Sequence, residues 1–169
     1  MPNNVLITGP PGIGKTTLIK HLLRDLIPVI VRGFYKEPIF ENGIIKGFRL
    51  ITTGLQEQIL AHVYFESPEK IETFGVNIEG LNKIANNELN LKNGAELYII
   101  DEIGRMECLS DTFCEKIRQI LDSDIPMIAS VAQIAAPELK KLKDRKDVSI
   151  VNVTHKNRDT LWKNILLKV

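Results

Sequence analysis

The stretch "GPPGIGKT", from Gly9 to Thr16, fits the phosphate-loop pattern G-x-x-x-x-G-K-[ST] at every fixed position. It follows the short apolar run "NVLIT" at 4–8 and opens the segment 15–26, whose leucines recur at helical spacing. This is the strand–loop–helix context that the pattern requires. The stretch therefore predicts an α/β fold of the P-loop NTPase class and a site for the phosphates of a nucleotide.

Each residue type in this loop has a physical reason to be there. Gly12 and Gly14 permit backbone angles that turn successive N–H groups toward an anion, and the following helix adds its positive dipole end. Lys15 is predicted to be catalytic through its charge on the β- and γ-phosphates, and the Thr16 hydroxyl is a candidate ligand of Mg²⁺. The residues expected to bind nucleotide here are Gly9, Pro10, Pro11, Gly12, Ile13, Gly14, Lys15, Thr16 and Thr17.

A second stretch, "LYIIDEIGRME" at 97–107, places two adjacent acids after four largely apolar residues. A buried charge costs roughly several kcal/mol unless it is paired or bound to a metal. Asp101 is therefore expected to end a strand at 96–101 and to hold Mg²⁺, in part through water. Glu102 is predicted to orient a water near the γ-phosphate and to accept its proton, which favours hydrolysis over transfer.

Three arginines are further candidates for the site. Arg105 either stabilises charge on the transferring phosphoryl group or pairs with Glu107 or Asp101 to hold its own loop, and the sequence leaves both open. Arg32 precedes the segment "GF" and either lies over the phosphate mouth or is only a solvated charge of the hairpin. Arg158 belongs to the segment considered next.

The tail "THKNRD" at 154–159 follows the last expected strand, where P-loop folds often place the base. Thr154, Asn157 and Arg158 are candidates for contact with base or ribose. The alternative is that Asn157 only caps the final helix. No NKxD-type guanine reader is present in the sequence.

The remaining pattern predicts one domain over 1–169, with a β-rich insertion at about 33–65. The insertion is expected to be a hairpin turning at Asn42-Gly43, followed by a strand at 59–65. Outside it, apolar runs alternate with helical periodicity, which predicts a mostly parallel sheet with helices on both faces. The other expected strands are 29–32, 126–132 and 148–153, and the other expected helices are 77–89, 110–121, 136–144 and 157–168.

Bulk composition limits the function classes. The 169 residues are 44% apolar and 25% charged, as in ordinary globular domains, and the net charge of +1 gives no strong nucleic-acid signal. Cys108 and Cys114 lack zinc spacing and are expected to be reduced thiols of a cytoplasmic protein. No apolar run approaches about 18 residues, so no membrane partner is expected. Nucleoside triphosphates are the expected small-molecule partners, and protein partners are left open.

The motifs "GPPGIGKTTL", "GFYKE…GIIKGFRL", "FGVNIEGL", "LYIIDEIGRMECLS" and "NVTHKNRDTL" extend over nearly the whole chain. With them the sequence resembles the cancer-related nucleoside-triphosphatase family, small P-loop NTPases that include thermophile enzymes. The resemblance implies Mg²⁺-dependent release of phosphate from ATP, GTP and other triphosphates, which leaves diphosphates, with loose base selectivity. It also implies a second nucleotide-binding segment made of Tyr98, Ile99, Ile100, Asp101, Glu102, Ile103, Gly104 and Arg105.

Two positions depart from the family pattern. Arg105 stands where the family commonly has Lys, which keeps the positive charge. Lys36 stands where the family often has Thr, so this chain lacks that hydroxyl.

Two other function classes fit the same phosphate site. One is a kinase of a nucleotide, a nucleoside or an RNA end, although the arginines are scattered and form no lid-like cluster. The other is a slow nucleotide-dependent switch in which the hairpin binds a partner. Glu102 favours the hydrolase over both.

Overall fold

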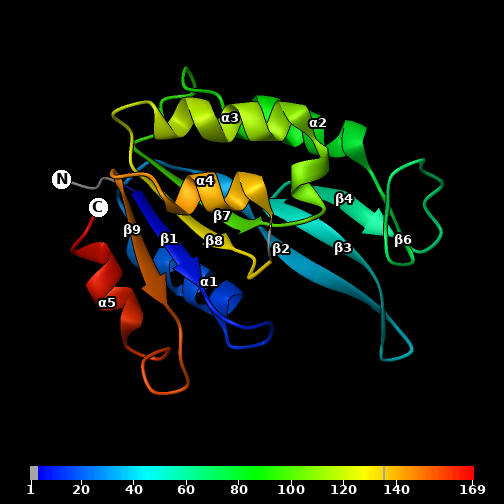
Figure 1. Cartoon of the computed structure of the whole chain (residues 1–169), viewed down its shortest axis with the longest axis horizontal. Helices are drawn as coiled ribbons and strands as arrows, with labels where there is room; N and C mark the ends of the chain where they lie inside the picture. Colours follow the sequence, from blue (N-terminus) through cyan, green and yellow to red (C-terminus); the bar gives the residue numbers. More distant parts are fainter. Residues whose placement is uncertain (1–3, 135) are drawn as a thin grey trace.

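The apolar runs of the sequence form one sheet, and helices lie against it on two sides (Figure 1). The structure is a computed structural model that describes residues 4–134 and 136–169. Within these residues the strands are β1 (Asn4–Thr8), β2 (Val31–Glu41), β3 (Ile44–Thr52), β4 (Glu57–His62), β5 (Lys70–Ile71), β6 (Phe74–Val76), β7 (Leu97–Ile103), β8 (Met127–Val131) and β9 (Val148–Asn152). The helices are α1 (Lys15–Asp25), α2 (Ile78–Glu88), α3 (Asp111–Leu121), α4 (Pro137–Lys143) and α5 (Leu161–Leu166), with a 3₁₀ turn η1 (Glu107–Leu109).

The sheet has a parallel half and an antiparallel half, in the order β5-β6-β4-β3-β2-β7-β8-β1-β9. Strands β2, β7, β8, β1 and β9 are parallel to one another. In β1, β7 and β8 nearly every residue is buried, as expected for strands covered on both faces. The predicted P-loop class of α/β fold, with helices on both faces, is confirmed.

The β-rich segment is an extension of this sheet. The expected strand at 29–32 and the first arm of the hairpin are one strand, β2, which pairs with β7 on one edge and β3 on the other. Asn42 and Gly43 have φ of 51° and 76°, so the predicted turn is confirmed. The strand expected at 59–65 is β4, which begins two residues earlier and ends at His62. Strands β5 and β6 were not predicted, because they have only two and three residues.

The helices divide between the two faces, as Figure 1 shows. Helices α2, α3 and α4 bury Leu81, Phe113 and Leu139 against one face. Helices α1 and α5 bury Leu18 and Ile165 against the other. Burial of such side chains from water is the main stabilising term of the fold. In the part of the chain that the structure describes, no helix is long and apolar enough to cross a membrane.

The predicted caps of α2 and α3 are confirmed, and the predicted start of α5 is wrong. Asn77 caps α2 by accepting from the N–H of Gly80, and Ser110 caps α3 by accepting from the N–H of Phe113. The final helix is shorter than predicted and begins only at Leu161. The Asn157 amide does not cap it, because it donates to the carbonyl of Asn152 and so fixes the preceding turn.

Candidate active site

The phosphate loop joins β1 to α1 at the carboxyl edge of the parallel strands. Gly12 and Gly14 have φ of 77° and 116°, the left-handed region that glycine adopts without strain. The Ile13 N–H donates to the carbonyl of Pro10 at 3.2 Å, and the Ile13 side chain is buried in the core beneath the loop. The predicted loop therefore has a built-in conformation, anchored from below by one apolar side chain.

Lys15 lies folded over this loop. Its ammonium donates to the carbonyls of Gly9 at 2.7 Å and Pro10 at 3.2 Å, and the residue is 9% exposed. Gly14 is the N-cap of α1 without a side-chain cap, and the first turn of α1 holds no acid. The amino end of the helix thus presents N–H groups and a lysine charge, and no acidic residue of its own first turn competes with an anion.

Asp101 is held against the loop by neutral donors. It is 2% exposed. The Thr16 hydroxyl donates to its Oδ2 at 2.7 Å and the Ser130 hydroxyl to its Oδ1 at 2.5 Å. The backbone N–H of Lys36 lies 3.4 Å from Oδ2. Since none of these donor groups carries a charge, the negative charge of the carboxylate is not balanced by its hydrogen bonds.

The pair Thr16 and Asp101 fits a Mg²⁺ ion. Both offer oxygen, which this hard cation prefers, and they touch each other beside the phosphate loop. Magnesium sites in nucleotide-binding proteins use one or two protein oxygens and complete their shell with phosphate and water. No group of three or more His, Cys, Asp or Glu side chains in the described residues is arranged around a metal position.

Strand β7 runs to Ile103, so the prediction that it ends at Asp101 is wrong by two residues. Ile103 still pairs with Val131 of β8, and the register shifts between Ile100 and Ile103. The two acids therefore lie inside an irregular part of the strand rather than beyond it. Glu102 keeps 25% of its side chain exposed, so solvent reaches it.

Glu102 pairs with a lysine of the hairpin. Its Oε1 lies 2.9 Å from the ammonium of Lys36, which is also 3.0 Å from Oε1 of the fully buried Glu107. Burial would lower the pKa of Lys36, but the carboxylates of Glu107 and Glu102 raise it above its ordinary value. Burial raises the pKa of Glu107, an effect that the lysine opposes. The ammonium therefore stays charged between the two acids.

The structure favours one of the two interpretations of Arg105. Arg105 is exposed, and its side chain forms no ion pair with the described residues; Glu107 pairs with Lys36 instead. The structure thus does not support the loop-holding interpretation, and Arg105 has the freedom to reach a ligand. Arg32 lies beside Tyr98 on the neighbouring strand, with its Nε buried and without a hydrogen-bond partner in the described residues.

The second predicted nucleotide-binding segment is only partly accessible. Tyr98, Ile99 and Ile100 are fully buried in the sheet, and the Tyr98 hydroxyl donates to the carbonyl of Asn90. Their side chains support β7 from within the core, so they are not the part of the segment that a nucleotide meets. Ile103 and Gly104 are likewise buried. The accessible part of the segment consists of Glu102 and Arg105.

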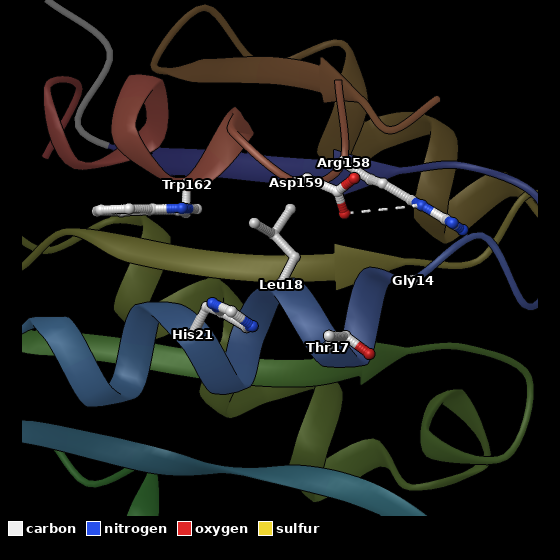
Figure 2. A pocket seen from close by; sticks show the side chains of 7 residues that line it. All are labelled: Gly14, Thr17, Leu18, His21, Arg158, Asp159 and Trp162. Atoms are coloured by element: carbon white, nitrogen blue, oxygen red, sulfur yellow. Dashed lines mark ion pairs between the residues drawn. The ribbon is translucent and has the colours of Figure 1, made fainter. Parts of the chain in front are cut away.

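A cavity of about 320 Å³ adjoins the phosphate loop on the side of α1. Figure 2 shows α1 on one side of it and the segment 158–162 on the other, with Leu18 directed between them. Arg158 reaches the loop, because its Nη1 lies 3.5 Å from the Ile13 carbonyl, and its Nε lies 3.9 Å from Asp159. The lining residues are Gly14, Thr17, Leu18, His21, Arg158, Asp159 and Trp162.

This geometry agrees with the comparison to known proteins. A family model described as NTPase matches residues 4–166. The chain belongs to this NTPase family. A nucleoside-triphosphatase THEP1 of Thermotoga sp. (strain RQ2) is 41% identical to it over 163 residues, which are 96% of this chain and 92% of that protein. The family resemblance read from the sequence motifs is confirmed.

Two solved structures resemble this NTPase family member. The crystal structure of THEP1 from the hyperthermophile Aquifex aeolicus has a TM-score of 0.88 at 31% identity and covers 97% of both chains. The solution structure of a human cancer-related nucleoside triphosphatase has a TM-score of 0.81 at 30% identity, covering 97% of this chain and 95% of that one. At these identities and scores the shared P-loop fold is shown.

Sequence reasoning missed three partners of the site in this family member. Ser130 could have been found, because it is a polar residue near the carboxyl end of a buried strand next to the Asp101 strand. Glu107 was considered only as a partner of Arg105. Lys36 gave a signal as a departure from the family pattern, but nothing local in the sequence indicates that it reaches Glu102, 66 residues further on.

Proposed function

We propose that this NTPase family member is a Mg²⁺-dependent nucleoside 5′-triphosphatase. It releases inorganic phosphate from ATP, GTP and other nucleoside triphosphates and leaves the diphosphate. The observation that carries the proposal is the 2.7 Å hydrogen bond between Thr16 and Asp101. It joins the phosphate loop to the strand that also carries the solvent-accessible Glu102.

The phosphate loop binds the triphosphate. Its N–H groups and the amino end of α1 face the β-phosphate, and Lys15 exchanges its two carbonyl partners for phosphate oxygens. A charged partner makes a stronger hydrogen bond than a neutral carbonyl does, so the exchange favours binding. As charge develops on the leaving oxygens, the same groups stabilise it.

Thr16 and Asp101 would hold Mg²⁺. When bound, the ion neutralises charge on the β- and γ-phosphate oxygens. Ser130 contributes indirectly, because its hydroxyl fixes one carboxylate oxygen of Asp101 and leaves the other beside Thr16.

Glu102 handles the attacking water. Its carboxylate accepts a proton from a water that is placed in line with the γ-phosphate, which makes the water a better nucleophile. Its partial exposure supports this role, since water reaches the carboxylate without any rearrangement of the core. Arg105 stands free in the next turn and is the candidate for stabilising charge on the transferring phosphoryl group.

The base lies in the cavity beside α1, where the ring of Trp162 and the side chain of Leu18 offer apolar contact. Arg158 and Asp159 are the charged residues of this lining, and they partly satisfy each other. These two charged side chains are 43% and 87% exposed, so neither is fixed in place for one base, and apolar contact with Trp162 discriminates weakly between bases. This supports the loose base selectivity that the sequence resemblance implies.

The test is a steady-state phosphate-release assay on ATP, GTP, CTP, UTP and TTP, each with and without Mg²⁺. The expected result is turnover of all five triphosphates that is abolished by removal of Mg²⁺. Release from a single triphosphate would overturn the loose selectivity, and equal release without the ion would overturn the metal dependence.

A parallel arm adds acceptors to Mg-ATP: nucleosides, nucleoside monophosphates and an RNA with a 5′-hydroxyl. If phosphate is transferred to an acceptor faster than it is released into water, the protein is a kinase and the proposed hydrolase activity is wrong. Tight nucleotide binding with negligible turnover in every arm would point to a switch.

A further inference from the structure

One lysine of the hairpin, at a position where the family often has Thr, touches both acids of the candidate site. Lys36 lies on β2, and its backbone N–H is 3.4 Å from Asp101 while its ammonium is 2.9 Å from Glu102. The ammonium also contacts Glu107 at 3.0 Å. The hairpin segment thus contributes to the site through a residue that neither the phosphate loop nor β7 supplies.

The ammonium is anchored from behind. Glu107 is fully buried, and within the described residues its Oε2 has no hydrogen-bond partner, so Lys36 is the charged group that compensates it. A buried carboxylate without a counter-charge is strongly unfavourable, and this makes the Lys36–Glu107 contact hard to break. The ammonium also lies over the ring of Phe48, 5.7 Å from its centre.

Gly104 leaves room for the carboxylates of Glu102 and Glu107. A Cβ added to Gly104 would lie 3.0 Å from Oε1 of Glu102 and 3.1 Å from Oε2 of Glu107. The missing side chain therefore lets the two carboxylates approach the same ammonium from one turn. Lys36, with 16% of its side chain exposed, fills the space between them.

We propose that Lys36 is a positioning residue of the triphosphatase reaction, which holds the Glu102 carboxylate in one orientation toward the attacking water while Glu107 anchors the lysine. The inference rests on the proposed function, in which Glu102 handles that water. A glutamate side chain has several rotatable bonds and loses catalytic efficiency if it samples other rotamers. The lysine fixes Oε1 and leaves Oε2 for the water. The role proposed for the lysine is therefore orientation of the carboxylate.

The test compares Lys36→Met with the parent chain in phosphate release and in binding of a non-hydrolysable ATP analogue. We expect kcat to fall roughly 10- to 10²-fold, the size of effect that a misplaced catalytic group has, with KM and analogue affinity nearly unchanged. Lys36→Arg, which keeps the charge, should recover part of the loss. The matched control is Lys46→Met, a lysine of the neighbouring strand β3 that contacts the Tyr64 ring and makes no ion pair in the described residues.

A double variant separates positioning from direct contact with phosphate. If Lys36 acts through Glu102, then Lys36→Met should cost little further activity in a Glu102→Gln background. An equal loss in both backgrounds, or a loss carried by KM, would overturn the proposal in favour of phosphate binding. Parent or higher kcat in Lys36→Met would also overturn it.

A folding control keeps the proposal testable. If Lys36→Met does not fold, Glu107→Gln replaces it, because it removes the anchor charge at similar volume. Glu107→Gln should lower kcat with KM unchanged, and parent turnover in that variant would overturn the proposal. A parent chain that releases no phosphate, or a Glu102→Gln variant with parent turnover, would instead contradict the proposed function itself.

Discussion

Asp101 and Glu102 are neighbours in β7, yet the side chains that donate hydrogen bonds to each come from different regions of the molecule. The phosphate-loop side, made of β1, α1 and β8, gives Asp101 two hydroxyl donors from Thr16 and Ser130. The hairpin side, made of β2 to β6 and α2, gives Glu102 the ammonium of Lys36. One acid is oriented without being neutralised, whereas the other is oriented by a full positive charge.

This difference assigns the two acids different partners. A carboxylate whose donors are all neutral still attracts a cation, so Asp101 suits a metal position. A carboxylate that already has an ammonium beside it gains less from a metal, and its remaining oxygen is available to water. The phosphate-loop side is thus suited to bind a charged ligand, and the hairpin side is suited to orient the Glu102 carboxylate.

The largest effect should come from the phosphate-loop side. Lys15→Ala removes the charge that the proposed function assigns to the β- and γ-phosphates in both ground and transition states. We expect turnover to fall by at least about 10²- to 10³-fold, with weaker nucleotide binding. Phosphate release and titration with a fluorescent nucleotide measure the two effects. Lys140→Ala on the exposed face of α4 is the control. Equal turnover in the two variants would show that the phosphate-loop side does not carry the larger share of catalysis.

The next largest effect should come from the acid that the hairpin side holds. Glu102→Gln keeps the size of the side chain and its contact with Lys36 but cannot accept a proton. We expect turnover to fall roughly 10²-fold while nucleotide affinity stays near that of the parent. Single-turnover phosphate release together with equilibrium binding separates the two. Hydrolysis of ATP at the parent rate would show that Glu102 is not the base.

The smallest effect should be one of stability alone. Asn77→Ala removes the cap of α2, which packs on the hairpin side. We expect the free energy of unfolding to fall by about 1 kcal/mol, with turnover per folded molecule unchanged. Urea unfolding followed by circular dichroism measures it, and Asn86→Ala on the exposed face of the same helix is the control. If turnover per folded molecule falls together with the free energy of unfolding, then the stability of the hairpin side also affects catalysis.

Features that depend on a few consecutive residues were predictable. The phosphate loop, the Asn42-Gly43 turn and the caps at Asn77 and Ser110 all follow from backbone angles or hydrogen bonds within four residues. The end of β7 and the start of α5 were wrong, because tertiary pairing with β8 prolongs the first and the Asn157 amide holds a turn before the second. Local propensity has no information on the β8 partner, whereas the Asn157 turn spans only five residues and replaces the first turn that was expected of the helix.

The sequence by itself therefore determined the P-loop class, the phosphate-binding segment and the pair of acids. Only the tertiary structure decided what each acid meets. Lys36 and Glu107 are 71 residues apart, and Ser130 is 29 residues from Asp101. These contacts exist because β2 and β8 flank β7 in the sheet. Strand order and register are set by burial of the whole core, and no short stretch of residues specifies them.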